Sequence, residues 1–385
     1  MGYSFETRCI HGEDHRVVDE YRAISTPIYQ TSSFSHIKPG HNLSGFDYSR
    51  ESNPTRAHLE ETMASLENAA DCVAFASGMA AITACFELFS PGDHILMSDD
   101  LYGGVVRLVH NIEEKNGLKI TFTDASDADN LKNMMTPKTK ALYVESPSNP
   151  MMHVADLKEC GRIAHEAGAL FIVDNTFLSP YFMTPMDLGA DIVLHSGSKF
   201  ISGHNDTICG FLSSKDPEIA KKVRLISKTV GSTLGALECW LAERGLKTLH
   251  VRMERHQENA CAIAEWLKTR TWVKKVFYVG DPEHPGHNKV KEQGRGFGSM
   301  ISFETDTKER ALAILQNVKL ITFAESLGGT ETLITYPDVQ THADVPQSVK
   351  DALGINDRLL RLSVGLENVK DLIEDLERSV SIAES

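Results

Sequence analysis

Lys199 is the residue whose type and setting bear most directly on chemistry. It lies in the run HSGSKF at 195–200, and Asp174 lies upstream at the end of the apolar run 169–173. A lysine amine that its surroundings keep neutral forms an imine with an aldehyde, and a buried carboxylate can pair with a protonated pyridine nitrogen. The two residues therefore predict an enzyme that holds pyridoxal 5′-phosphate (PLP) as a Schiff base on Lys199. A lysine considered alone is more often a solvated surface residue.

A second group of residues could hold the phosphate of such a cofactor. The turn Ser-Gly-Met at 77–79 follows the apolar run 73–76 and opens a segment with helical character. A glycine there allows close approach of the backbone, and the first N–H groups of a helix attract anions. Ser196 and Ser198 flank the strand of the lysine and could add hydroxyl donors. Taken singly, these residues are also compatible with an ordinary tight turn or a helix cap.

Three further residues follow or occupy apolar runs where a ligand could bind. Tyr102 stands beside two glycines and could lie flat over an aromatic ring, although a half-buried tyrosine is an equal alternative. Asn149 lies between two prolines, where it is either a turn residue or a donor to a ring hydroxyl. Arg361 lies inside the apolar run LLRLS at 359–363, and a buried arginine could grip a carboxylate with two hydrogen bonds.

The elements that must position these residues alternate between helices and short apolar strands from about residue 59. We expect strands at 73–77, 94–98, 120–123, 141–145, 169–173 and 191–194. Helices are expected at 59–67, 79–89, 105–114 and 156–166, and one long helical connection at 237–267. Near-continuous apolar strands between helices predict an α/β fold with a mostly parallel sheet covered on both faces. Ligands in such sheets bind at the carboxyl ends of the strands.

The pattern divides the chain into three parts. Residues 1–58 are rich in Ser, Thr, Pro, Gly and Tyr, and we expect an irregular arm there. Residues 59–249 form the predicted cofactor-binding domain. Residues 250–385 form a smaller α/β domain, with strands expected at 276–278, 300–303, 321–323 and 360–363 and helices at 308–316 and 369–379.

Composition limits the partners of the chain. The 385 residues carry a net charge of −14, which argues against nucleic acid as a partner. The apolar runs are too short to cross a membrane, and we expect no signal peptide because the first residues contain no apolar core. The seven cysteines form no Cys-x-x-Cys pair, which favours free thiols in a reducing cytoplasm. His284 and His287 lie in a loop-like segment without an obvious third ligand, so we expect no metal site.

Together these motifs resemble the PLP-dependent enzymes of cysteine and methionine metabolism. This family includes cystathionine γ-synthase, cystathionine γ- and β-lyases, methionine γ-lyase and O-acetylhomoserine sulfhydrylase. The resemblance runs nearly end to end, through FDYSR (46–50), NPTR (53–56), SGM (77–79), YGG (102–104), SPSNP (146–150), VDNT (173–176), HSGSK (195–199), GHND (203–206) and 359–367. It implies the type I PLP-dependent transferase fold, in a homotetramer of two close dimers with active sites at the dimer interface.

The resemblance also implies roles for individual residues. Lys199 would be the Schiff-base lysine, and Asp174 would pair with the ring nitrogen. The phosphate would be held by Gly78, Met79, Ser196 and Ser198, and by Tyr48 and Arg50 of the neighbouring subunit. Tyr102 would stack on the ring and assist at the leaving group. Arg361 would bind the α-carboxylate of an amino-acid substrate, with Asn149 nearby.

The choice of reaction depends on fewer residues. The segment FAESLGG at 323–329 resembles members that act at the γ-carbon, and it places Glu325 and Ser326 among the expected substrate-binding residues. Glu325 and Asp47 would meet the incoming cysteine or the distal amino group. Gly104 stands where methionine γ-lyases carry a cysteine, which disfavours methionine cleavage. The resemblance favours a cystathionine γ-synthase that uses an O-acylated homoserine, with cystathionine γ- or β-lyase as the alternative.

A function of another class is a non-catalytic protein that keeps this fold and binds an aminated metabolite. The joint presence of Lys199, Asp174, Tyr102 and Arg361 argues against that alternative, because a binding protein has no use for the lysine.

Overall fold

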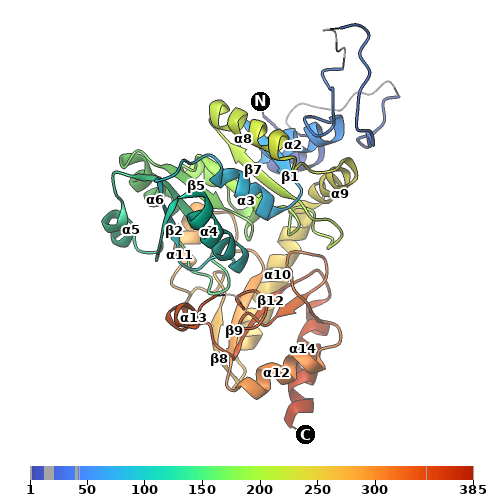
Figure 1. The fold of residues 1–385 in the computed structure, drawn as a ribbon. Helices are drawn as coiled ribbons and strands as arrows, with labels where there is room; N and C mark the ends of the chain where they lie inside the picture. Colours follow the sequence, from blue (N-terminus) through green and yellow to red (C-terminus); the bar gives the residue numbers. More distant parts are fainter. Residues whose placement is uncertain (1, 13–20, 40–41, 43, 344, 385) are drawn as a thin grey trace.

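The computed structural model describes residues 2–12, 21–39, 42, 44–343 and 345–384. Within these residues the strands form two sheets, one of seven strands and one of five, with helices packed against each (Figure 1). The long helix α10 (Leu249–Lys268) leads from the larger sheet to the smaller one. The α/β architecture predicted from the sequence, with a mostly parallel main sheet and a smaller second sheet, is confirmed.

The larger sheet has the strand order β1-β7-β6-β5-β4-β2-β3. Its strands are β1 (Asp71–Phe75), β2 (His94–Ser98), β3 (Lys119–Thr123), β4 (Thr139–Glu145), β5 (Leu170–Asp174), β6 (Ile192–Ser196) and β7 (Gly210–Ser214). The strands from β3 to β6 pair in parallel, whereas β7 is antiparallel to both β6 and β1. The carboxyl ends of β4, β5 and β6 therefore meet at one edge, which is where a ligand is expected.

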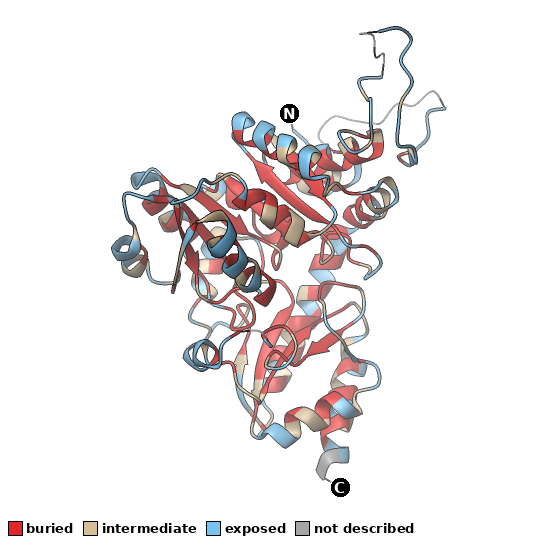
Figure 2. Cartoon of the chain, viewed as in Figure 1, coloured by how far each residue is buried: buried red, intermediate tan, exposed pale blue. Residues whose placement is uncertain are grey.

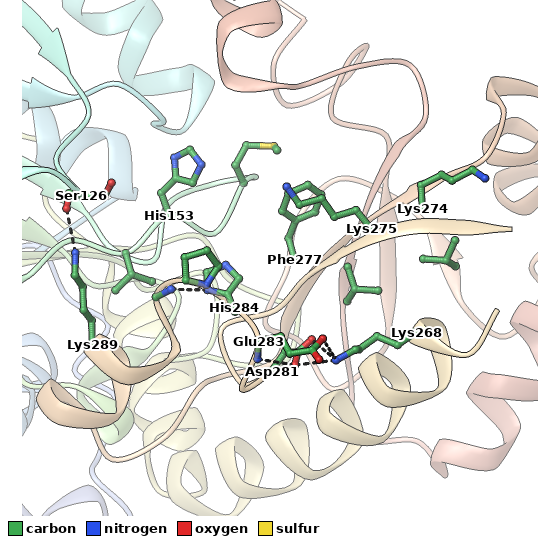
Figure 3. A pocket seen from close by; sticks show the side chains of 16 residues that line it. Ser126, His153, Lys268, Lys274, Lys275, Phe277, Asp281, Glu283, His284 and Lys289 are labelled. Carbon is green, nitrogen blue, oxygen red and sulfur yellow. Dashed lines mark hydrogen bonds and ion pairs between the residues drawn. The ribbon is translucent and has the colours of Figure 1, made fainter. Parts of the chain in front are cut away.

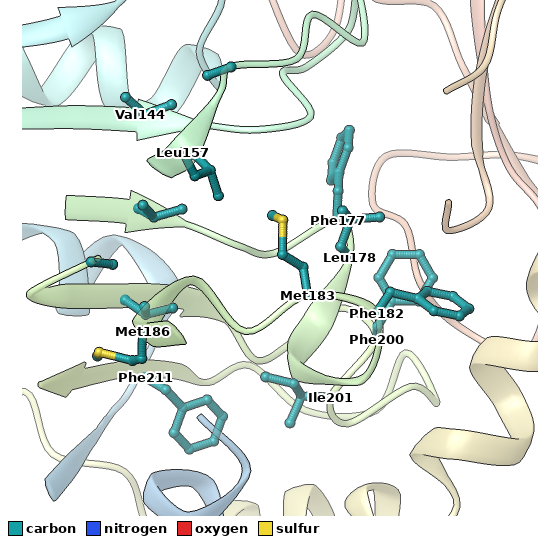
Figure 4. Packing of buried hydrophobic residues seen from close by; sticks show 14 of the residues in the cluster. Val144, Leu157, Phe177, Leu178, Phe182, Met183, Met186, Phe200, Ile201 and Phe211 are labelled. Atoms are coloured by element: carbon teal, nitrogen blue, oxygen red, sulfur yellow. The ribbon is translucent and has the colours of Figure 1, made fainter. Parts of the chain in front are cut away.

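Helices cover both faces of this sheet. They are α2 (Pro54–Leu66), α3 (Gly78–Phe86), α4 (Gly103–Asn116), α5 (Ala128–Met134), α6 (Leu157–Glu166), α7 (Ser179–Phe182), η1 (Pro185–Leu188), α8 (Pro217–Val230) and α9 (Ala236–Leu246). Along β4, Leu142 and Val144 pack into one core cluster and Ala141 and Tyr143 into another, as alternation along a strand requires. Figure 4 shows Val144 with Leu157 of α6 in the first cluster. Figure 2 shows the strands buried and the outer faces of α4 and α5 exposed.

The smaller sheet has the order β10-β11-β12-β9-β8. Its strands are β8 (Val273–Phe277), β9 (Met300–Thr305), β10 (Thr322–Phe323), β11 (Leu333–Thr335) and β12 (Leu359–Ser363), and its helices are α11 (His287–Gln293), α12 (Lys308–Asn317), α13 (Gln347–Leu353) and α14 (Val369–Glu384). A third cluster joins the apolar faces of α10, α12 and α14 to β9 and β12. The central strand β12 carries Arg361, so this sheet delivers that side chain toward the larger one.

Two expectations about helices were wrong. The predicted long connection at 237–267 is two helices, because α9 ends at Leu246 and α10 begins at Leu249. Between them Thr248 leaves the helical conformation, and its hydroxyl donates to the carbonyl of Gly245 at 3.1 Å. A side chain that competes for a backbone carbonyl in this way favours a helix end.

The first 58 residues are not uniformly irregular. The structure places α1 (Phe5–His11) there, and α2 begins at Pro54 rather than at 59. Proline suits the first position of a helix, and the side chain of Asn53 accepts the N–H of Thr55 at 2.9 Å as a cap. Much of the segment between these helices projects from the body in Figure 1, and 13–20, 40–41 and 43 lie outside the described residues. The boundaries after 58 and 249 stay predictions.

The structure describes all seven cysteines, and none forms a disulfide. Six of them are buried, and burial raises the thiol pKa to about 12 for Cys9, Cys85 and Cys160 and further for Cys72, Cys209 and Cys239. None of the described helices has the length and apolar character needed to cross a bilayer. The described residues also contain no group of three or more His, Cys, Asp and Glu side chains arranged to hold a metal ion.

Candidate active site

A cavity of about 420 Å³ lies where β4, β5 and β6 end, within the size range of small-molecule sites. Both sheets contribute to its lining. Of the residues singled out in the sequence, it is lined by Gly78, Met79, Tyr102, Asn149, Asp174, Ser196, Ser198, Lys199, Glu325, Ser326 and Arg361. The structure thus brings together residues that are spread over most of the chain.

Lys199 follows β6 and its amine points into this cavity. The amine donates to the hydroxyl of Ser326 at 2.8 Å. Burial, aided by the positive charge of Arg361, lowers the pKa of Lys199 from 10.5 to about 8, while Glu325 acts in the opposite direction. A neutral amine is therefore accessible near neutral pH, which a reaction with an aldehyde requires.

The backbone around Lys199 is held by a buried arginine. Arg252 of α10 donates to the carbonyl of Phe200 at 2.7 Å and to that of Gly245 at 2.8 Å. The carbonyl of Lys199 accepts the N–H of Gly203 at 2.8 Å. These bonds fix the turn that presents the lysine, so the position of its amine depends on packing as well as on its own rotamer.

Two buried acids lie side by side at the strand ends. Asp174 ends β5 and pairs in register with Glu145, which ends β4. Burial raises the pKa of both carboxyls, and for Glu145 the charge of Asp174 adds to the effect. Asp174 accepts the N–H of Thr176 at 3.0 Å, and no cationic side chain is bonded to it among the described residues. A protonated ring nitrogen would supply the missing positive partner, so this site fits the cofactor.

The start of α3 offers a cradle for a phosphate. Ser77 caps the helix by accepting the N–H of Ala80 at 3.1 Å, which leaves the N–H groups of Gly78 and Met79 without intrahelical partners. An added Cβ on Gly78 would lie 3.0 Å from Ser196, so the two approach closely. This cradle also fits the cofactor.

The two serines near the lysine differ in their hydrogen bonding. The hydroxyl of Ser198 is engaged by the main chain of Cys209, accepting its N–H at 2.9 Å and donating to its carbonyl at 3.2 Å. The hydroxyl of Ser196 makes no such bond within the described residues. Ser196 is therefore the freer of the two donors for an anion.

Tyr102 precedes α4 and is 40% exposed. Its N–H donates to Glu145 at 3.1 Å, which fixes the backbone above the buried acids. Its ring lies against Gly104, where an added Cβ would come within 2.5 Å of the ring and 3.2 Å of the sulfur of Met79. The ring thus occupies the space that a side chain at position 104 would need.

Arg361 is almost completely buried at the floor of the cavity. Its guanidinium donates to the side-chain carbonyl of Asn149 at 2.8 Å, and to Ser326 O and the hydroxyl of Thr335 at 3.3 Å each. Its Nε has no hydrogen-bond partner within the described residues. A buried donor without a partner is costly, and a carboxylate in the cavity would satisfy it.

Ser326 and Glu325 line the cavity from the part of the chain that builds the smaller sheet. Ser326 has a φ of +117°, which is uncommon for a residue other than glycine and is a form of strain found at functional sites. Its carbonyl faces Arg361 and its hydroxyl faces Lys199. The carboxylate of Glu325 is exposed at the cavity and acts electrostatically on both cations.

Three expected residues do not reach the cavity of their own chain. Asp47 pairs with His36 at 2.8 Å, and the guanidinium of Arg50 donates to the carbonyl of Lys228 while lying 5.4 Å from the ring of Tyr48. All three are exposed on the arm. Their expected roles need a second subunit and stay predictions.

Other lining residues were not assigned in the sequence, among them Glu145, Thr176, Asn205 and Thr341. The position of Glu145 at a strand end could have been predicted, because it ends an apolar run just as Asp174 does, but its burial could not. Thr176 lies two residues after Asp174, and its hydroxyl accepts the N–H of Ser196 at 2.8 Å, so it joins two strand ends. Nothing in the local sequences around Asn205 and Thr341 indicates that both residues line the same cavity.

A second cavity, of about 500 Å³, lies between the part of the chain with the larger sheet and the part with the smaller one. It is lined by His153, His284 and several lysines (Figure 3). Lys268 there is neutralised by Asp281 at 2.9 Å and Glu283 at 2.8 Å. Lys289 is tied to the carbonyl of Ser126 at 3.0 Å. This cavity lacks a buried lysine beside a buried acid, so the smaller one is the candidate active site.

Comparison with known proteins identifies the family. A family model described as Cys/Met metabolism PLP-dependent enzyme matches residues 6–381. Cystathionine beta-lyase of Lactococcus lactis subsp. cremoris is 44% identical over 377 residues, which cover 98% of this chain and 99% of that protein.

Solved structures agree with that match. Cystathionine gamma-lyase from Lactobacillus plantarum complexed with L-serine has a TM-score of 0.96 and 42% identity, covering 99% of this chain and 100% of that one. Cystathionine gamma synthase from Xanthomonas oryzae pv. oryzae in complex with cystathionine has a TM-score of 0.96 and 38% identity, covering 100% and 99%. The chain belongs to the Cys/Met metabolism PLP-dependent enzymes, a family whose cofactor is pyridoxal 5′-phosphate, and its relatives are enzymes of transsulfuration.

Proposed function

We propose that the protein is a cystathionine γ-synthase, which joins cysteine to an O-acylated homoserine by γ-replacement. The observation that carries the proposal is the meeting of Lys199, Asp174 and Arg361 in one cavity with a free carboxylate, Glu325, at its wall. The first two residues serve the cofactor, and the other two match the carboxylate and the distal ammonium group of an amino acid.

In this proposal Asp174 would accept a hydrogen bond from the ring nitrogen, and Tyr102 would stack on the ring. Gly78, Met79, Ser196 and Ser198 would hold the phosphate. When bound, PLP supplies an electron sink for negative charge that develops at the substrate's α-carbon. Asp174, buried and without a cationic partner among the described residues, would keep that sink effective by favouring the protonated ring.

The chain's own residues perform the proton transfers and the positioning. Arg361 and Asn149 hold the α-carboxylate, which fixes the α-hydrogen relative to the lysine. The neutral amine of Lys199 would take the α-proton as a general base. A γ-leaving group requires removal of a second proton, from the β-carbon, and the same amine can transfer it. The phenol of Tyr102 assists the departing group.

Glu325 supports action at the γ-carbon. A substrate or product of the cystathionine type carries a distal ammonium group, and an exposed carboxylate at the cavity wall is a suitable partner for it. Gly104 supports the exclusion of methionine cleavage, because a cysteine there would displace the ring of Tyr102 from its present position.

Cystathionine γ- or β-lyase activity is the second candidate. It is favoured by the comparisons, because the relatives named as lyases are 44% and 42% identical to this chain and the γ-synthase is 38% identical. Cystathionine is the product of a γ-synthase and the substrate of a lyase, so the residues of this cavity are compatible with either reaction.

A substrate panel with product identification tests the proposal. The purified holoenzyme with O-acetyl- or O-succinyl-homoserine plus cysteine is expected to yield cystathionine. Release of pyruvate or 2-oxobutyrate from cystathionine, without any synthesis, would replace the proposal with the lyase function. Borohydride reduction followed by peptide mass spectrometry should place the reduced cofactor on Lys199; a cofactor mass on another residue would overturn its role.

A neutral isostere tests the role of Glu325. Glu325→Gln is expected to raise KM for cysteine or cystathionine on the order of tenfold, which corresponds to about 1.4 kcal/mol, and to leave PLP affinity unchanged at a pH above about 8, where Lys199 is already neutral. Glu309→Gln, on the exposed face of α12, removes the same charge far from the cavity and serves as the control. An equal loss of substrate and cofactor binding in E325Q would remove the assignment.

We also propose an assembly and a compartment. In a homotetramer of two close dimers, Tyr48 and Arg50 would reach the phosphate of the neighbouring subunit, and Asp47 would lie at that subunit's entrance. The proposal is supported by their exposure on the projecting arm. The free thiols support a reducing, cytoplasmic environment.

A further inference from the structure

We infer that His342 is a positioning residue that fixes Asn149 and, through it, the carboxylate-binding guanidinium of Arg361. The inference rests on the proposed function, since it concerns how the amino-acid substrate is held. His342 does not line the cavity and has no other part in the mechanism.

The hydrogen bonds of His342 fix its protonation state. The imidazole is 1% exposed, and its Nε2 lies 3.1 Å from the main-chain carbonyl of Asn149. Because a carbonyl only accepts, Nε2 carries the proton. Nδ1 then accepts the hydroxyl proton of Thr341 at 2.8 Å. Burial, with Arg361 nearby, lowers the pKa of His342 to about 4, while hydrogen bonding to the backbone of Asn149 and Leu101 acts in the opposite direction, so the ring is neutral at physiological pH.

Asn149 is held at both of its oxygens. Its main-chain carbonyl accepts from His342, and its side-chain carbonyl accepts from Arg361 Nη1 at 2.8 Å. Asn149 and Arg361 are 3% and 2% exposed, so both bonds are largely shielded from bulk water. Loss of the histidine donor would leave a buried carbonyl unsatisfied and release the loop that carries the arginine's partner.

The segment Thr341–His342 also contacts the start of α4. The carbonyl of Thr341 lies so close to Gly103, at the start of α4, that an added Cβ would be 2.3 Å away. Thr341 and His342 belong to the part of the chain that builds the smaller sheet, whereas Gly103 and Asn149 follow strands of the larger one. The segment therefore fastens two loops of the larger sheet against the residues that bind substrate.

A buried histidine could instead serve only the stability of the core. The two roles differ in a measurable way, because a positioning residue affects ligands with a carboxylate and leaves ligands without one unchanged. L-Serine and ethanolamine form such a pair, since the amine lacks only the carboxylate. Their binding is followed as a change in the absorbance of bound PLP in the holoenzyme, a readout independent of the reaction.

Three substitutions make the test. His342→Leu removes every hydrogen bond of the imidazole, and His342→Asn keeps a polar group too short to reach Asn149. His342→Gln keeps an N–H donor close to the position of Nε2. We expect His342→Leu and His342→Asn to raise Kd for L-serine about tenfold, as the loss of a buried hydrogen bond implies, with Kd for ethanolamine unchanged. His342→Gln should stay within about threefold of the wild type.

The control is His94→Leu. His94 is also buried and bonded to two hydroxyls, of Thr139 at 2.7 Å and Thr121 at 3.0 Å, but it lies at the opposite end of β2 from the cavity. It should lower Tm without changing the ratio of the two dissociation constants. Equal weakening of both ligands by H342N, or a lower Tm with unchanged ligand binding, would overturn the inference. A wild-type holoenzyme that does not respond to L-serine would instead overturn the proposed function.

Discussion

The amine of Lys199 lies between charges of opposite sign, which set its affinity for a proton. Burial and Arg361 lower its pKa to about 8, and Glu325 opposes them. Only the neutral amine attacks an aldehyde, so the reactive fraction grows as pH rises through this pKa. An ordinary lysine, with a pKa of about 10.4, would be almost wholly protonated at the same pH.

We expect the rate at which the cofactor-free protein takes up PLP to rise with pH and to level off above about 8. Glu325→Gln removes a negative charge that favours the ammonium form, so it should move the midpoint to lower pH. Stopped-flow absorbance at constant ionic strength measures both. A midpoint near that of a free lysine, or a shift to higher pH in the variant, would contradict this electrostatic origin.

The sequence predicts this part of the site well, because Lys199, Asp174 and Arg361 are unusual residue types next to or inside apolar runs. It does not predict that Glu145 is buried. That burial depends on the register of β4 and β5, which sets Glu145 opposite Asp174. Register is a property of strand pairing between distant segments, so it cannot be predicted from the sequence of one strand.

At the scale of elements, the phosphate cradle depends on how closely α3 approaches β7. An added Cβ on Gly210, the first residue of β7, would lie 2.2 Å from the carbonyl of Ser77 and 2.6 Å from Gly78. These are backbone atoms that cannot turn aside. Because residue 210 is glycine, the start of α3 can pack directly against β7. Gly210 pairs with Ser196 of β6, so this contact lies beside the expected phosphate donors.

Gly210→Ala is expected to push the turn at 77–79 away from the sheet and to weaken PLP binding by tenfold or more, through misplaced N–H donors, at a cost of about 1–3 kcal/mol. Equilibrium titration of the apoprotein with PLP measures it. Gly168→Ala is the control, because its φ of +71° makes alanine strained although no atom lies within 4 Å. The control should lose stability and keep its PLP affinity; unchanged PLP affinity in G210A would refute the role of this contact.

Elements were predictable to different degrees. The parallel strands are apolar enough to be recognised, whereas β7 has the sequence GFLSS, with one glycine and two serines, and gives little signal. Its place between β1 and β6 comes from pairing on both sides. The division between α9 and α10 is also hard to predict, since Lys247 and Thr248 are compatible with a continuous helix and the bond from the Thr248 hydroxyl to the carbonyl of Gly245 is seen only in the structure.

At the scale of the whole molecule, the arm is separated from the cavity of its own chain. Arg50 contacts Lys228 on its own chain, and neither Tyr48 nor Arg50 lines the cavity. A site completed by a neighbour would make activity depend on assembly, because each cavity would combine residues of two chains.

Mixing inactive variants tests this arrangement. Arg50→Ala and Lys199→Ala, dissociated and reassembled together, should regain activity, because a mixed dimer contains one cavity with neither change. Lys199→Ala mixed with Asp174→Ala is the control, since both residues line the cavity of one chain and every cavity keeps a defect. Absence of regained activity in the first mixture would show that the arm does not act on a neighbour.

The protected cysteines have a consequence for a protein whose relatives process sulfur compounds. Six thiols are buried and hold their protons far above neutral pH, so they hardly form the thiolate that attacks disulfides or meets oxidants. Only Cys261 is partly accessible. The molecule can therefore work in a concentrated pool of reactive sulfur metabolites without exchanging sulfur with them through most of its own cysteines.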